Sequence, residues 1–486
     1  MKRTIFSNDF APYYPIGLQP CPMYVNVANR IHELLVKEME LKSPDTDKLK
    51  KEIAINIAIY YEDKMSNIGL WNTFVEKHLK MYGYPLPFVD NLEVLDKEDV
   101  NADEVKLLIW LVLSRYFQDK FLNPLAIDDD TTASIIRILE DDDEIEINKS
   151  LYDFIYDKDT ANDYFKLKKI LFWLRRSYLL CSPLANDRYS DLYNLFNKRI
   201  SKNETFYYVE TMFSITTEIG PLSLPPHIWL AEMYYNHSMD SEASKLKKLK
   251  YCQQDIFLIK EINTEFAILK DSLGKEYKLK NNFPALNHKD LYVTTSLVLY
   301  GDNNWEINGF MYESDHNQYR KNCEHKQQLA ASYEHNYPHF MKRTKGKRIA
   351  FFENIDQLKD WLHKITPNTN INQIAHQLPS CSQVGFISQK AGIIFAPDII
   401  HAIKCKDNPY YKKCDDRQMR TETMNAVINI ESTHPELLNY LLENNMLQDG
   451  DISYNMPCKL GNEIFTHNID FIARNHRRHY YHDHDY

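Results

Sequence analysis

The spacing of apolar residues changes near residue 252. Before that point, apolar positions recur every three or four residues, which is the spacing of one face of an α-helix. From about 256 to 312 they alternate with polar positions, as in strands that bury one face. The pattern predicts an α+β protein that is mainly α, with a helical N-terminal region, a small antiparallel β barrel and an α+β C-terminal region.

The first region, residues 1–250, is predicted to be a helical domain. Residues 22–39 carry apolar side chains at helical spacing, and Ser43-Pro44 ends that helix because the residue before proline avoids the α conformation. Residues 105–117 and 165–180 are apolar on nearly every side. Such helices lie inside a bundle, covered by other helices.

Residues 251–313 are predicted to form the β module. Asn263-Thr264, Ser272-Leu273-Gly274 and the polar residues 301–304 supply turn chemistry between apolar runs. The short strands in so small a segment favour an SH3-like or OB-like barrel, and an open antiparallel sheet packed on the helices is the alternative. The five predicted strands are residues 256–262, 265–270, 275–280, 291–300 and 305–312.

Residues 314–475 show mixed patterns, which predict an α+β domain. A polar helix runs to about residue 335, and a strand and a helix follow at 349–352 and 354–365. Residues 384–396 read as a hairpin. The histidine-rich residues 476–486 are predicted to be a flexible tail.

Composition limits the classes of protein that fit. The 486 residues suggest two to four domains, and the formal charge of -10 disfavours binding of nucleic acid over the whole surface. No window of 18 apolar residues and no signal-like N-terminal segment occur, so we expect neither membrane spanning nor secretion. Eight dispersed cysteines without a CxxC pair fit a reducing cytoplasm.

The strongest basic run follows Tyr333, Tyr337 and Phe340. Cations beside aromatic rings suit single-stranded nucleic acid, because phosphates bind the cations and bases stack on the rings. A solvated loop that joins a helix to a strand explains the same residues. The candidate nucleic-acid-binding residues are Lys342, Arg343, Lys345, Lys347 and Arg348.

A metal site is a second candidate. Cys323 and His325 lie two residues apart, and His335 and His339 form an i,i+4 pair that shares a helical face. The spacing matches no common zinc module, so no cofactor is predicted, while a divalent metal stays open. In the tail, His476, His479, His482 and His484 chelate metals only weakly.

Catalytic motifs are absent. Walker, Rossmann, HExxH and GxSxG patterns do not occur. Asp271, Glu276 and Lys278 are candidates for a nuclease site, because two acids can hold Mg²⁺ and a lysine can stabilise the charge of a phosphate. Such spacing is common by chance in a chain with many charged residues. Cys405 and Cys414 are a conceivable redox pair. The sequence therefore favours a protein that is not an enzyme.

Several segments resemble an uncharacterised family found mainly in Bacteroidota. They include Gly69-Leu70-Trp71-Asn72-Thr73-Phe74 and Trp305-Glu306-Ile307-Asn308-Gly309. Similar stretches occur at residues 82–88, 408–411 and 468–474. The resemblance spans most of the chain, and the tail is an addition to it. It implies no activity, cofactor or catalytic residue.

We therefore expect a non-catalytic cytoplasmic binding protein. Its β module and adjoining basic loop contact nucleic acid, a ribonucleoprotein or a protein partner, and no membrane. One alternative is a metal-dependent phosphodiesterase or nuclease, for example in defence against foreign nucleic acid. The other is a scaffold that binds only proteins. The oligomeric state is open.

Overall fold

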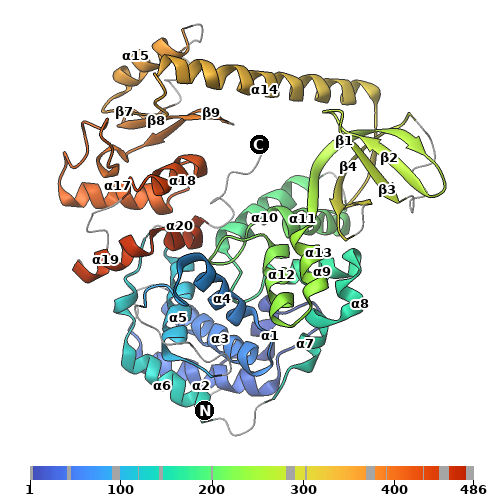
Figure 1. Cartoon of the computed structure of the whole chain (residues 1–486). Helices are drawn as coiled ribbons and strands as arrows, with labels where there is room; N and C mark the ends of the chain where they lie inside the picture. The colour runs from blue at the N-terminus through green and yellow to red at the C-terminus, as the bar shows by residue number, and fades with distance from the viewer. Residues whose placement is uncertain are drawn as a thin grey trace. The chain divides into compact units, whose positions relative to one another are not determined.

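The described part of the protein is mainly helical, with a closed β barrel and a separate three-stranded sheet (Figure 1). This confirms the predicted α+β, mainly α, fold class. Within the described ranges, no helix has both the length and the apolar character needed to cross a bilayer. The computed structural model describes residues 4–40, 45–89, 99–118, 120–141, 146–198, 201–280, 290–301, 304–367, 371, 378–389, 391–430, 432–447 and 459–477.

The chain forms two compact units. Unit 1 comprises Met1–Leu86, Asn91–Leu108 and Asp129–Gln328, and unit 2 comprises Pro87–Asp90, Ile109–Asp128 and Leu329–Tyr486. The helical region and the barrel thus share unit 1, although the sequence pattern changes between them at 250 and 251. The division at Gln328 falls within helix α14 (His316–Arg343).

Unit 1 is built around helix α3. Residues Ile53 to Lys64 of this helix are all buried, and α3 packs against α2 and α4. Helix α5 (Ala102–Tyr116) begins in this unit and continues into unit 2. The other helices of unit 1 are α1 (Ser7–Phe10), η1 (Ala11–Tyr13), α2 (Pro22–Glu38), α3 (Thr46–Met65), α4 (Leu70–Tyr82), α6 (Asp129–Glu140), α7 (Lys149–Tyr156), α8 (Lys158–Ala161), α9 (Tyr164–Leu174), α10 (Pro183–Phe196), α11 (Lys202–Thr216), α12 (Pro226–Asn236) and α13 (Asp240–Lys247).

The junction between α3 and α4 depends on two residues. Gly69 has a φ of 78°, and a Cβ at this position would lie 2.7 Å from the ring of His237. The Asp63 carboxylate accepts hydrogen bonds from the backbone nitrogens of Leu70 at 3.0 Å and Trp71 at 2.7 Å. A carboxylate at the start of a helix binds N–H groups that lack partners within the helix. Asp63 therefore caps α4.

The barrel closes because β1 pairs with both β2 and β4. Strand β5 lies between β3 and β4 and runs parallel to β3 through the pair Leu279 and Trp305. The closed sheet confirms the predicted barrel and excludes the open-sheet alternative, and its Greek-key strand order agrees with the OB-like form of the barrel. The strands are β1 (Lys250–Ile262), β2 (Phe266–Lys270), β3 (Glu276–Lys280), β4 (Tyr292–Leu299), β5 (Trp305–Ile307) and β6 (Tyr312–Ser314).

Two details of the predicted barrel were wrong. The sheet is mixed and not purely antiparallel, because β3 and β5 pair in parallel. The predicted strand 305–312 is also two strands. Gly309 has a φ of 101°, which takes the chain out of the extended conformation after β5, and β6 then pairs with β4 separately.

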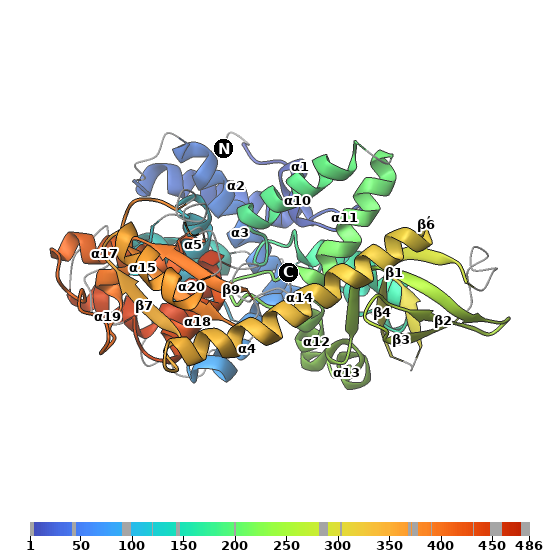
Figure 2. The ribbon, with the colours of Figure 1, turned by 90° about the horizontal axis from the view of Figure 1, so that it is seen from above.

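The first half of α14 lies against the barrel (Figure 2). The Tyr319 hydroxyl donates to the carbonyl oxygen of Asp271 at 2.9 Å. The buried carboxylate of Asp255 accepts a hydrogen bond from Asn322 Nδ2 at 2.6 Å and pairs with Lys326 Nζ at 3.0 Å. These contacts fix the N-terminal part of α14 to the barrel.

Unit 2 contains the three-stranded antiparallel sheet β7-β8-β9. Strands β8 and β9 form the predicted hairpin, and α15 follows β7 as expected. The elements are η2 (Pro124–Ala126), β7 (Ile349–Phe352), α15 (Ile355–Ile365), β8 (Gln383–Ser388), β9 (Gly392–Pro397), η3 (Ile400–Ala402), α17 (Asp416–Ile428), α18 (Pro435–Glu443), α19 (Lys459–His467) and α20 (Ile469–Arg477).

Helix α20 extends into the segment predicted as a tail. His476 and Arg477 are its last residues, and both are buried. The Arg477 guanidinium donates to backbone carbonyls at the end of α17 and beyond it, including those of Val427 and Thr433, each at 2.7 Å. These two residues are therefore part of the folded unit. Residues 478–486, with His479, His482 and His484, lie outside the described residues.

Candidate nucleic-acid interface

The solvent side of strands β2 and β3 carries a regular set of side chains, here called the barrel face. The strands alternate between buried and outward positions, so their inward residues, such as Leu269 and Tyr277, join the barrel core. The register pairs the outward residues across the strands. The barrel face consists of Phe266, Ile268 and Lys270 on β2 and of Glu276, Lys278 and Lys280 on β3.

The barrel face has an excess of positive charge. Its one acid, Glu276, forms an ion pair with Lys260 of β1 at 2.6 Å between Nζ and Oε1. Because that pair is neutral overall, Lys270, Lys278 and Lys280 leave the face with three positive charges. One exposed acid of β1, Glu261, is the register partner of Ile268 and lies at the edge of this face. Lys278 and Lys280 are exposed and Lys270 is half-buried. The face therefore attracts anions.

An aromatic ring lies among these cations. Phe266 is half-buried, is paired in register with Lys280, and has the Nζ atom of Lys278 at 4.5 Å from its ring centroid. Because the Lys278 ammonium lies over this ring, a base can stack on Phe266 only after Lys278 swings away, for example towards a phosphate. The sequence suggested cations beside aromatic rings in the segment after residue 333. On the barrel, a ring and several cations lie together at Phe266.

Turn hydrogen bonds hold β2 and β3 in place. The Asp271 carboxylate accepts from the backbone nitrogens of Leu273 at 2.9 Å and Lys275 at 2.8 Å, and from the Tyr277 hydroxyl at 2.9 Å. Asp271 is thus a buried turn residue, and Glu276 points outward to Lys260. The structure does not bring Asp271, Glu276 and Lys278 together as a magnesium site.

The basic run 342–348 lies in unit 2, and most of its cations have contacts there. Arg343 Nη1 donates to the carbonyl oxygen of Ile365 at 2.6 Å, at the end of α15. Lys347 pairs with Asp407 at 2.8 Å. Lys342 and Lys345 are exposed. The run is therefore largely a set of structural contacts.

Arg348 has the most contacts in the run. It pairs with Glu436 at 2.6 Å, donates to the carbonyl oxygen of Ile387 at 3.2 Å, and lies 4.6 Å from the ring centroid of Phe386. These contacts join β7, β8 and α18. A guanidinium engaged in this way has little capacity left for phosphate.

The four metal candidates all lie on α14, but they do not converge. His335 lies twelve positions after Cys323 along the helix, which corresponds to a rise of about 18 Å. His335 and His339 are exposed, and their rings stack with centroids 5.9 Å apart. Within the described ranges, no group of three or more His, Cys, Asp or Glu residues is arranged to hold a metal ion. The candidate Cys323–His325–His335–His339 site therefore has no common centre.

The redox pair is not a disulfide in this structure. Cys405 and Cys414 are both free thiols and half-buried. Burial raises the pKa of the Cys414 thiol, and the neighbouring carboxylate of Glu422 raises it further. A raised pKa lowers the fraction of reactive thiolate. This environment does not favour Cys414 as a nucleophile.

Comparison with protein families gives one match. Residues 10–316 and 302–478 match a family described as protein of unknown function (DUF3843). The chain belongs to this family. The match includes every segment on which the resemblance rested, so the expectation of a family without an established activity is confirmed. Comparisons of this DUF3843 chain with curated proteins and with solved structures found no match.

Sequence reasoning did not identify Phe266, Lys270 and Lys280 of the DUF3843 chain as candidates. Their signal was present, since each alternates with a core residue such as Ala267 or Leu279. The alternation shows that they point outward, but only the strand register places Phe266 opposite Lys280. Lysines on a strand exterior otherwise look like ordinary solvent-facing residues.

Proposed function

We propose that this DUF3843 chain is a non-catalytic cytoplasmic binding protein whose barrel face contacts single-stranded nucleic acid. The observation that carries the proposal is the placement of Lys270, Lys278 and Lys280 around Phe266 on one side of a closed barrel. Small Greek-key barrels with this strand order include oligonucleotide binders, and that likeness is an analogy of fold.

The charges favour a polyanion as the ligand. Three lysines lie on two adjacent strands, and the barrel face has no acid apart from the paired Glu276. Neighbouring strands are about 4.8 Å apart, and alternate residues along a strand are separated by about 6.6 Å. This spacing suits successive phosphates of an extended single strand better than a single small anion.

The ring supplies the contact that a base requires. Stacking on an aromatic side chain contributes about 1–3 kcal/mol per base and tolerates any sequence. Phe266 is the aromatic residue of the barrel face, and the half-buried Ile268 extends the apolar area beside it. We therefore expect binding with little sequence preference.

The test is fluorescence anisotropy with a labelled single-stranded oligonucleotide of about 12 nucleotides, within the usual site size for such barrels. The triple variant Lys270→Glu, Lys278→Glu, Lys280→Glu should lose measurable binding, because three attractive phosphate contacts become repulsive. Phe266→Ala should weaken binding roughly fivefold or more, as expected for the loss of one stacked base.

A matched control makes the same change of charge elsewhere in unit 1. Lys149→Glu, Lys158→Glu, Lys202→Glu alters three exposed lysines on helices and should leave the affinity nearly unchanged. Equal loss in both triple variants would show that only net charge matters. If the wild type binds no oligonucleotide but retains a protein partner after nuclease treatment, the scaffold alternative holds instead.

A further inference from the structure

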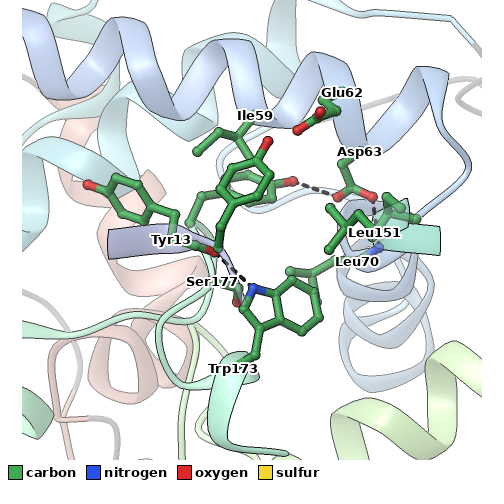
Figure 3. A pocket seen from close by; sticks show the side chains of 11 residues that line it. Tyr13, Ile59, Glu62, Asp63, Leu70, Leu151, Trp173 and Ser177 are labelled. Atoms are coloured by element: carbon green, nitrogen blue, oxygen red, sulfur yellow. Dashed lines mark hydrogen bonds between the residues drawn. The ribbon is translucent and has the colours of Figure 1, made fainter. Parts of the chain in front are cut away.

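A small cavity lies in unit 1 between α3, η1, α7 and the residues around the end of α9. Four aromatic side chains and two carboxylates are part of its lining: Tyr13, Tyr14, Trp173, Tyr178, Glu62 and Asp63. In Figure 3, Glu62 and Asp63 approach from α3, and the indole of Trp173 lies on the other side. Trp173 Nε1 donates to the carbonyl oxygen of Tyr13 at 2.8 Å, which fixes the indole.

The size of the cavity limits its occupant. The volume that the centre of a water molecule can reach inside the cavity is about 20 Å³. One water needs about 10–15 Å³ by this measure, so the cavity takes a ligand of one or two heavy atoms. Tyr13 is only half-buried and marks the side nearest to solvent.

Two buried polar atoms of the lining lack hydrogen-bond partners within the described part of the chain. They are Glu62 Oε2 and the Tyr14 hydroxyl. Glu62 is fully buried and Tyr14 is 4% exposed. The other oxygen of Glu62, Oε1, accepts a hydrogen bond from Asn148 Nδ2 at 2.9 Å. Desolvation raises the pKa of the Glu62 carboxyl to about 7, and hydrogen bonds from Asn148 and from the backbone of Cys21 oppose this shift, so the carboxyl is fully ionised only above neutral pH. A buried polar atom without a partner costs about 1–3 kcal/mol, and more when it is charged.

Asp63 differs from Glu62 in this respect. Both of its carboxylate oxygens accept hydrogen bonds, one from the backbone nitrogen of Leu70 and the other from the backbone nitrogen of Trp71 and the Tyr178 hydroxyl. Asp63 therefore has both oxygens engaged, and burial raises the pKa of its carboxyl, so Glu62 Oε2 is the acceptor of the lining that a ligand can reach.

The chemistry of the lining matches a small cation with N–H donors. Aromatic rings attract ammonium groups through their negative faces, and a buried carboxylate gains most from a partner that is both charged and hydrogen-bonding. We propose that the cavity binds an ammonium ion or a primary ammonium of methylammonium size, with Glu62 Oε2 and the Tyr14 oxygen as acceptors. This site is separate from the barrel face.

The experiment is isothermal titration of the full-length protein with methylammonium chloride at constant ionic strength and at about pH 8.5, above the Glu62 pKa of about 7, so that the carboxyl is ionised. Tetramethylammonium chloride is the comparison, because it has the same charge but no N–H donor and is too large for the cavity. We expect saturable one-site binding of methylammonium and none of tetramethylammonium. Since the site is distant from Lys270, Lys278 and Lys280, their reversal should leave this binding unchanged.

Two variants locate the site. Glu62→Gln keeps the shape and removes the charge, and it should weaken binding about tenfold or more, as for a lost hydrogen bond between charged groups. Tyr14→Phe removes one acceptor and should weaken binding less. Glu38→Gln, at an exposed residue of α2, is the matched control and should bind like the wild type.

Three results would overturn the proposal. Absence of saturable binding to the wild type would mean that water occupies the cavity. Equal affinity for both ions would exclude recognition of N–H donors. If Glu62→Gln and Tyr14→Phe both remain folded by circular dichroism and both bind as tightly as Glu38→Gln, the ion binds elsewhere.

Discussion

Lys168 shows how burial changes the charge of a single side chain. It is 2% exposed, and its Nζ donates to the Tyr207 hydroxyl at 2.9 Å and lies 4.7 Å from the centroid of that ring. Desolvation lowers the pKa of Lys168 from 10.5 to about 7, and the nearby Glu306 opposes the shift. In the folded state Lys168 therefore loses its proton near pH 7, whereas in the unfolded chain it keeps the proton until about pH 10.5.

The consequence is a stability that rises with pH between about 7 and 10.5. In this window the unfolded state binds one proton more than the folded state at Lys168, so the free energy of unfolding increases with pH. Lys168→Met removes this dependence. The Tm of Lys168→Met should exceed that of the wild type by more at pH 6.5 than at pH 9.5.

Thermal melts of both proteins at the two pH values measure the difference directly. The conservative variant Lys168→Arg keeps the charge and should not raise Tm at pH 6.5. A Tm difference between Lys168→Met and the wild type that is the same at both pH values would contradict the assignment.

At the scale of elements, a buried ion pair joins α3 to α5. Lys64 Nζ lies 3.1 Å from Glu104 Oε2, and both side chains are 1% exposed. The Tyr60 hydroxyl, also on α3, donates to the same Glu104 oxygen. Burial of such a pair adds little stability by itself, but removal of one partner leaves the other charge without compensation.

Lys64→Met should therefore destabilise unit 1 by about 3–5 kcal/mol. Replacing Glu104 as well, in Lys64→Met, Glu104→Gln, should recover part of that loss, because the isolated buried charge is gone. Urea denaturation of the two variants and the wild type measures both effects. Ordinary surface substitutions change the free energy of unfolding by less than about 0.5 kcal/mol. A decrease of that size in Lys64→Met would show that the pair is not buried in solution.

At the scale of the whole molecule, the net charge of -10 repels a nucleic acid, whereas the local positive charge of the barrel face attracts it. A protein with a basic surface overall binds nucleic acid through many phosphate contacts and loses affinity steeply with salt. Here the proposed contact depends on Lys270, Lys278 and Lys280, and the net negative charge of the chain as a whole repels the rest of the strand.

Binding should therefore show a small salt dependence. For three contacts on a single strand, the logarithm of the association constant should fall with the logarithm of salt concentration with a slope of about -2. Lys280→Gln should reduce the slope by about 0.7. Anisotropy titrations at several salt concentrations measure the slope. A value steeper than about -5 would mean that many more cations take part.

The sequence was enough to predict the main elements, because their signals are local. Alternation identifies β2 and β3 and assigns Lys278 and Lys280 to the exterior, and helical spacing identifies the bundle. The parallel pairing of β3 with β5 escaped prediction, because a parallel neighbour distant in sequence leaves no local pattern.

By itself, the sequence determined the fold class and the family of this protein, because both depend on residue patterns along the chain. Only the tertiary structure decided which residues meet. It engaged Arg343, Lys347 and Arg348 with partners in unit 2, grouped Phe266 with three lysines, and placed Glu62 beside Tyr14 at one cavity. Such contacts join segments far apart in sequence, and their energies depend on burial, which no local pattern records.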